Sequence, residues 1–153
     1  MTTTLLPAVI DALVTVATAA VAPVPVYDGE HVAEEPGPFL MVGVEDLESS
    51  TSPLSASAEQ SWASVGAKSR DESGRVVCVA YCDDGSARMK AARDGVFDIA
   101  DRLEQGLRAD PYLGGVTGLL WAEYGGSIQL TQAQYQGGAV AMLAFQVNYR
   151  ARI

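Results

Sequence analysis

The chain has 153 residues, of which 48% are hydrophobic, and its formal net charge is −9 at pH 7. This length is sufficient to bury one hydrophobic core, so we expect a single domain over residues 1–153. All ten Lys and Arg residues lie at or after Lys68. Tight DNA binding needs clustered cations to replace the counterions of the phosphates, so the composition argues against a stable nucleic-acid complex.

A helix is expected near the start of the chain. Thr3 or Thr4 can cap it, and Pro7 suits its first turn. The expected core stripe is Leu6, Ile10, Leu13 with Val14, and Ala17. The surrounding low-charge stretch is interrupted by Asp11 and three prolines, and no basic residue precedes it. We therefore expect neither a secretory signal nor a membrane span, and a cytosol-like environment.

Two short strands are expected next, at Val24–Tyr27 and Phe39–Val44, with the first at a sheet edge beside its prolines. Residues 28–38, between these two strands, form an acidic stretch. Residues 48–58, after the second strand, are rich in Ser, Thr and Pro. Both stretches are expected to be flexible loops.

A hairpin with a charged tip is predicted after the second loop. Its strands are Ser61–Ala67 and Arg75–Tyr81, joined across Ser69–Gly74. Cys78 and Cys82 would lie about 13 Å apart along such a strand, which is too far for a mutual disulfide bond. We expect two free thiols.

A long amphipathic helix follows the turn Asp83–Ser86 and ends at Asp110-Pro111. Its apolar face recurs at steps of three or four residues: Met89, Ala92, Val96, Ile99, Leu103 and Leu107. This pattern is typical of a helix that packs on a sheet.

Three further strands are predicted, at Val116–Tyr124, Ser127–Tyr135 and Ala139–Arg152, with Gly125-Gly126 and Gly137-Gly138 as hairpin turns. Apolar and polar residues alternate in the last strand up to the final residue, so this end is expected to be docked or bound by a partner. The predicted fold class is α+β: a mostly antiparallel sheet with an N-terminal helix and one long central helix packed on it.

The sequence offers no catalytic, cofactor-binding or metal-binding constellation. His31 is the only histidine, and no Gly-x-Ser-x-Gly motif accompanies it. The carboxylate pairs Asp83-Asp84 and Glu34-Glu35 are more typical of solvated turns and helix caps than of an acid and a base in a dry cleft. We therefore expect a protein that is not an enzyme.

The C-terminal strands instead resemble an association surface. Glu123 is the only ionised side chain from Pro111 to Tyr149, and interfaces are depleted of charge and enriched in aromatic residues. Packing beneath the helices would explain the aromatic residue Trp121 as well as an interface would. Similarly, a solvated surface would explain Arg150 and Arg152 as well as contact with a partner would. The candidate residues for a subunit or partner interface are Trp121, Tyr124, Tyr135, Arg150 and Arg152. The two arginines are candidates for contact with the acid-rich first third of an adjacent subunit.

Four segments, by their order and spacing, resemble the tail terminator (tail completion) proteins of long-tailed, siphovirus-type phages, particularly those of actinobacterial hosts. They are Ser69-Arg-Asp-Glu-Ser-Gly-Arg-Val-Val-Cys78, Ala91-Ala-Arg-Asp-Gly-Val-Phe97, Leu107-Arg-Ala-Asp-Pro-Tyr-Leu-Gly-Gly115 and Phe145-Gln-Val-Asn-Tyr-Arg-Ala-Arg-Ile153. The resemblance spans most of residues 60–153.

This resemblance implies a structural virion protein without a cofactor, assembled in the host cytoplasm. It would form a ring, expected to be a hexamer, at the head-proximal end of the tail tube. There it would end tube polymerisation and join the tail to the head-tail connector. Its partners would be further copies of itself, the tube protein and the connector protein, with DNA only passing through the lumen and no membrane. The alternatives are another head-tail joining or tail tube component, a small-molecule-binding α+β domain, and an enzyme with a scattered carboxylate pair.

Overall fold

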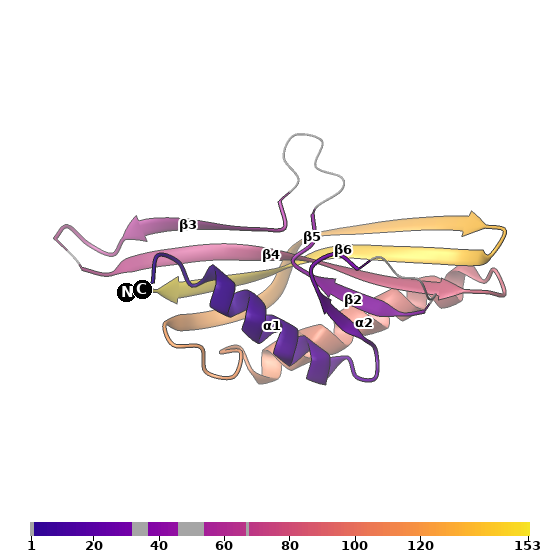
Figure 1. The fold of residues 1–153 in the computed structure, drawn as a ribbon, viewed down its shortest axis with the longest axis horizontal. Coiled ribbons are helices and arrows are strands. Elements are labelled where there is room, and N and C mark those ends of the chain that lie inside the picture. The colour runs from indigo at the N-terminus through magenta and orange to yellow at the C-terminus, as the bar shows by residue number, and fades with distance from the viewer. Residues whose placement is uncertain (1, 32–36, 46–53, 67) are drawn as a thin grey trace.

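The computed structural model describes residues 2–31, 37–45, 54–66 and 68–153 (Figure 1). The elements run in the order α1 (Leu6–Ala20), β1 (Val26–Asp28), β2 (Phe39–Val42), β3 (Ala56–Trp62), β4 (Arg70–Asp84), α2 (Met89–Ala109), β5 (Leu119–Tyr135) and β6 (Gly138–Arg152). The fold is α+β with a mostly antiparallel sheet and two helices, as the sequence predicts.

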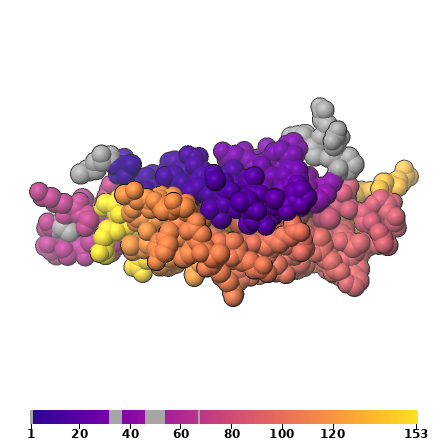
Figure 2. Space-filling model, turned by 90° about the horizontal axis from the view of Figure 1, so that it is seen from below, coloured from indigo at the N-terminus to yellow at the C-terminus, as the bar shows by residue number. Residues whose placement is uncertain are grey.

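The sheet has the strand order β1-β2-β4-β6-β5, and β3 pairs with β4 beside that path. Only β1 and β2 run parallel among the described pairs. One edge of β4 is shared, because β3 pairs with residues 70–76 and β2 with residues 78–81. The β3–β4 hairpin therefore extends at one end of the molecule and the β5–β6 hairpin at the other (Figures 1 and 2).

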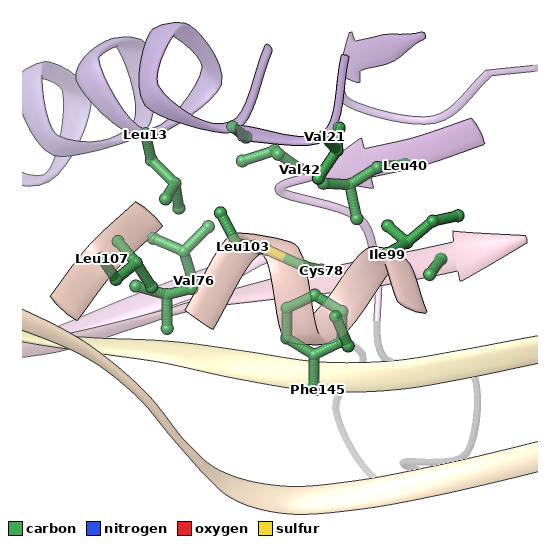
Figure 3. Packing of buried hydrophobic residues seen from close by; sticks show 14 of the residues in the cluster. Leu13, Val21, Leu40, Val42, Val76, Cys78, Ile99, Leu103, Leu107 and Phe145 are labelled. Atoms are coloured by element: carbon green, nitrogen blue, oxygen red, sulfur yellow. The ribbon is translucent and has the colours of Figure 1, made fainter. Parts of the chain in front are cut away.

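Both helices pack on one face of the sheet and share its core. Leu13 of α1 points toward Leu103 and Leu107 of α2, above Val76 of β4 (Figure 3). The predicted stripe of α2 is confirmed, since its members are buried and Met89 packs at the margin. The turn and cap predicted at Asp83–Ser86 are only partly right, because Asp83 and Asp84 still belong to β4 and the N-cap residue of α2 is Arg88, without a side-chain cap. The Asp84 carboxylate instead accepts a 2.9 Å hydrogen bond from the Arg88 N–H just before the helix.

The predicted stripe of α1 is partly wrong. Val9, Leu13 and Ala17 are the buried residues, whereas Leu6 and Ile10 are only half-buried. The side chains at steps of four from Val9 form the line that faces the core. The helix has Leu5 as its N-cap residue, and the Thr4 hydroxyl accepts a hydrogen bond from the N–H of the first helical residue.

The predicted hairpin exists, but its register is wrong. The first strand is β3, seven residues at Ala56–Trp62, so the end of the loop predicted at 48–58 is strand; residues 48–53 of that loop lie outside the described residues. Of the charged segment Ser69–Gly74, residues 70–74 belong to β4 rather than to the tip. A Ser- and Ala-rich strand such as β3 has no clear apolar alternation, which is why sequence pattern misplaces it. In the loop predicted at 28–38, residues 32–36 lie outside the described residues, and Asp28 belongs to β1.

Gly125-Gly126 is not a hairpin turn, because β5 runs as one strand through it. The pairing with β6 shifts between Gly125 and Gln129, and Gly126 has a φ of +81°. This is a bulge, which bends the strand without reversing it. By contrast, a hairpin turn does form next to Gly137-Gly138, one residue earlier than predicted, because Gly138 starts β6 and pairs with Tyr135. The apolar residues of β6 are buried in alternation. The final residue is docked within the chain, since the Ile153 N–H donates a 2.9 Å hydrogen bond to the Arg70 carbonyl.

Candidate functional site

The five candidate interface residues fall at two ends of the sheet rather than on one surface. Trp121 and Tyr124 lie on the first half of β5, beside Arg150 and Arg152 at the end of β6, and Trp121 is the cross-strand partner of Arg150. Tyr135 lies at the opposite end, next to the β5–β6 turn, where it is 67% exposed. The sequence pattern therefore combined two separate patches.

The two aromatic residues on the first half of β5 differ in their surroundings. Tyr124 is half-buried and packs on the core, with its ring centroid 5.1 Å from that of Phe145. Trp121 is 37% exposed. Tyr124 is thus largely a packing residue, whereas Trp121 presents part of its ring to solvent.

Arg152 has a partner within its own chain. Its guanidinium donates hydrogen bonds of 2.7 and 3.2 Å to the Asp71 carboxylate on β4. This hydrogen bonding holds the pKa of Asp71 below its ordinary value and raises the pKa of Arg152. Arg150 is exposed and lies near enough to Asp71 to lower the same pKa. Any contact of Arg152 with another subunit would have to compete with Asp71.

A groove lies between the C-terminal end of α2 and β5. Its volume is about 290 Å³, and its walls are Glu104, Leu107, Arg108, Pro111, Trp121, Ala122, Glu123 and Tyr124. The Pro111 carbonyl accepts a 2.7 Å hydrogen bond from the Ala122 N–H, which holds the chain after α2 against β5. Glu104 and Arg108 form an ion pair on the rim. We call this hollow the α2–β5 groove.

The tip of the β3–β4 hairpin exposes apolar side chains that the sequence pattern did not single out. Trp62 is 66% exposed and Val65 is fully exposed. The Arg70 guanidinium carbon lies 5.8 Å from the centroid of the Trp62 ring, and the same guanidinium hydrogen-bonds to Gln60. Composition alone would have placed Trp62 in the core, because tryptophan is highly buried on average.

Glu72 is a buried carboxylate that the sequence also did not reveal. It is 0% exposed and accepts hydrogen bonds from the Leu5 N–H at 2.9 Å, from the Tyr149 hydroxyl at 2.7 Å and from the Gln60 amide. Burial raises its pKa, but these donors, together with Thr4, outweigh burial, so the pKa lies below its ordinary value. The carboxylate joins the start of α1 to three strands, which is a structural role.

The groups with potential chemistry are dispersed. His31 stacks on Tyr27 with ring centroids 3.6 Å apart. Both cysteines are free, and burial raises the pKa of the Cys78 thiol to about 12. The Asp84 carboxylate is engaged by Arg88. Within the described ranges, no His, Cys, Asp and Glu residues group closely enough to hold a metal ion.

Two comparisons with known proteins give no identification. No model of a known protein family matches the chain, and no curated protein sequence matches it. Of the helices in the described part of the chain, neither is long and apolar enough to cross a membrane.

Proposed function

We propose that this protein is a structural subunit of a phage tail: a tail terminator that forms a ring on the head-proximal end of the tail tube. In this role it ends tube polymerisation and provides the surface that joins the tail to the head-tail connector. The observation that carries the proposal is the elongated molecule (Figure 2) with a hairpin tip at each end of its sheet (Figure 1), where Trp62 is exposed at one tip and Tyr135 at the other. Exposed aromatic residues at projecting tips favour contact with other subunits.

The segments that resemble tail terminators form one connected framework, which supports the proposal. Residues 71–78 of β4 pair in register with residues 145–152 of β6, so the first and last of the four segments are direct partners. Gly74 sits opposite Tyr149, and a Cβ at Gly74 would overlap the tyrosine ring. Gly95 of the second segment likewise lies against Cys82. The segments that carry the resemblance therefore contain residues that pair and pack within one fold, and they are not a set of scattered surface residues.

The charge distribution is compatible with DNA passing through a lumen without being held. The net charge is −9, and the nine acidic residues before Lys68 have no basic residue among them. An acidic surface repels phosphates, so it prevents sticking without preventing transit.

Imaging of the purified chain tests the assembly class. Sedimentation velocity together with electron microscopy should show closed rings of one size. A double Arg150→Glu, Arg152→Glu variant then separates two roles for these arginines. A folded monomer would place them in the interface between copies, whereas rings of wild-type size with normal tails would assign them to the solvated surface.

A small-molecule-binding domain is the second candidate function, because the α2–β5 groove lies between helix and sheet. Its volume of about 290 Å³ is at or below the low end for ligand pockets, about 300–1,000 Å³. A defined monomer whose melting temperature rises with a small ligand would favour this candidate over assembly.

A further inference from the structure

The second half of β5 is an unprotected sheet edge. β5 ends the strand order β1-β2-β4-β6-β5, and in the described part of the chain it pairs with β6 alone. Residues 126–135 contain neither a charged residue nor a proline, and Ile128 and Leu130 are 51% and 37% exposed. Natural edge strands normally carry charges or prolines, because their free N–H and C=O groups pair readily with other chains. This edge is therefore suited to accept an added strand.

The first half of β5 is not free in the same way. The Ala122 N–H donates a 2.7 Å hydrogen bond to the Pro111 carbonyl, so the chain after α2 lies against this half. A register shift between Gly125 and Gln129 separates it from the regular pairing of Gln129–Tyr135. The free edge of β5 is this second, regular stretch.

The opposite edge of the sheet contains one strand that matches it. β1 has only three residues, and Pro25 and Asp28 protect it. β3 has seven residues, carries one charge, at Glu59, and pairs with β4 alone among the described strands. Its last residue, Trp62, is 66% exposed. β3 is therefore a second edge strand with an uncovered apolar side chain.

Strand direction allows β3 and β5 to pair between copies. β3 and β6 are both antiparallel to β4, and β5 is antiparallel to β6, so β3 and β5 run in opposite directions. A copy rotated about an axis along the strands keeps these directions, so its β3 is antiparallel to β5 of the first copy. Within one chain, β4 and β6 hold β3 and β5 about 14 Å apart. Their pairing therefore requires a second copy.

The faces of the two strands also match. Gln60 hydrogen-bonds to Glu72, which accepts the N–H at the start of α1, so Gln60 lies on the helix-covered face of the sheet. Trp62 comes two residues later and lies on the same face. Leu130 pairs with the buried Leu143 and also lies on that face. Residues directly opposite each other on paired strands share a face, so Trp62 and Leu130 are compatible partners.

We propose that β3 of one copy adds antiparallel to the free edge of β5 of the next copy, with Trp62 opposite Leu130. Residues 57–62 then pair with residues 130–135, and the indole ring covers the exposed leucine. No like charges face each other, because that stretch of β5 is uncharged. The contact joins the β3–β4 end of one copy to the β5–β6 end of the next (Figure 1).

This register staggers the copies along the strands. β2 pairs with β4 beyond the residues that β3 occupies, so β1 and β2 of the added copy lie past the β5–β6 turn and leave the edge accessible. Two different edges make the contact heterologous, so it repeats from copy to copy and closes into a ring when the rotation allows. The inference rests on the proposed function only in requiring that copies associate.

Cysteine cross-linking tests the register, in which Ser61 lies opposite Thr131. In a Cys82→Ser background, one variant carries Ser61→Cys and another Thr131→Cys; Cys78 is buried and does not compete. Under mild oxidation, their mixture should give a dimer that neither variant gives alone, since opposite Cβ atoms are about 5 Å apart. Ser61→Cys mixed with Glu123→Cys, on the first half of β5, should give none. Absence of the first dimer, or equal yield of the second, overturns the inference.

A lysine on the free edge tests its use in association. Leu130→Lys should weaken self-association at least about tenfold, because a charge on an edge strand opposes strand addition. Leu120→Lys is the matched control, since Leu120 is 45% exposed on the first half of β5, and it should associate like the wild-type chain. Circular dichroism melts check that both variants fold. Equal association of the folded Leu130→Lys and wild-type chains overturns the inference.

A charge pair tests the same register without cysteines. Glu59 faces Ala133, so Ala133→Glu should weaken association, and adding Glu59→Lys should recover it. Failure of the double variant to recover overturns the pairing. Rings of wild-type size from the folded Leu130→Lys chain would overturn the contact and leave the proposed function standing. Cross-linked rings that do not limit tube length would overturn the function and keep the contact.

Discussion

The hydroxyl of Tyr149 on β6 donates a 2.7 Å hydrogen bond to the buried carboxylate of Glu72 on β4. The same carboxylate oxygen accepts the N–H of Leu5 at the start of α1. One buried negative charge therefore fixes both terminal regions of the described chain to the sheet. A buried carboxylate is tolerated only when donors replace its lost hydration, so each donor contributes to stability.

Removing the tyrosine hydroxyl should weaken the fold. Tyr149→Phe leaves the carboxylate with one donor fewer, and the expected loss is about 1–3 kcal/mol in the free energy of unfolding. Urea denaturation followed by circular dichroism measures it. Tyr135→Phe is the control, since the hydroxyl of that residue is at an exposed tip and its loss should cost almost nothing. Equal unfolding midpoints for the two variants would show that the Glu72 contact is unimportant.

Glu72 should make the protein less stable in acid. Its pKa is lowered in the folded state, so the unfolded state binds its proton first as the pH falls. The contribution of Glu72 is then fully present above its ordinary pKa of 4.5 and is lost as the pH falls below that value through the folded pKa. Glu72→Gln should flatten this part of the stability profile, and urea titrations from about pH 3 to pH 7 measure the slope. A profile with an unchanged slope in the variant would contradict the assignment.

Gly74 should not tolerate a side chain. A Cβ at this position would overlap the ring of Tyr149, which is held by its hydrogen bond to Glu72 and cannot easily move. Gly74→Ala should therefore cost about 1–3 kcal/mol by overpacking, although alanine is ordinarily the better residue in a strand. Gly85→Ala is the control, because a Cβ added there would meet no other atom within 4 Å. Thermal melts of the two variants should separate, with only Gly74→Ala destabilised.

Leu103 anchors α2 in the core. It is fully buried beside Leu13 and Val76, so Leu103→Ala should cost about 2–5 kcal/mol in the free energy of unfolding. Leu120→Ala removes the same atoms from an exposed position on β5 and should change stability by less than about 0.5 kcal/mol. Comparable losses in both variants would mean that burial does not set the cost.

Local periodicity predicted the elements whose one face is buried. The stripe of α2 and the alternation of β6 follow directly from packing against a single core, so both could be recognised in the sequence. The register of β3 could not, because Ala, Ser and Gln along that strand do not distinguish its faces. Gly125-Gly126 is compatible with a turn or a bulge, and pairing with β6 selects the bulge.

The candidate surfaces were harder to predict than the fold. Trp121 was identified because its surroundings lack charge, and it does line the α2–β5 groove. The burial of Glu72 depends on a distant residue, because the N–H that it accepts from Leu5 is 67 positions away. Trp62 is exposed because it ends β3 at the tip of the β3–β4 hairpin. A sequence window around either residue contains no sign of this, since both effects depend on how the strands and α1 are arranged in the fold.

Tube length in the presence of this protein tests the proposed function most directly. Tail tube protein is polymerised alone and with increasing amounts of the purified chain, and tube lengths are measured by electron microscopy. We predict that tubes become shorter as the chain is added and carry a ring at one end only. An unchanged length distribution, with no ring at either end, would contradict the account.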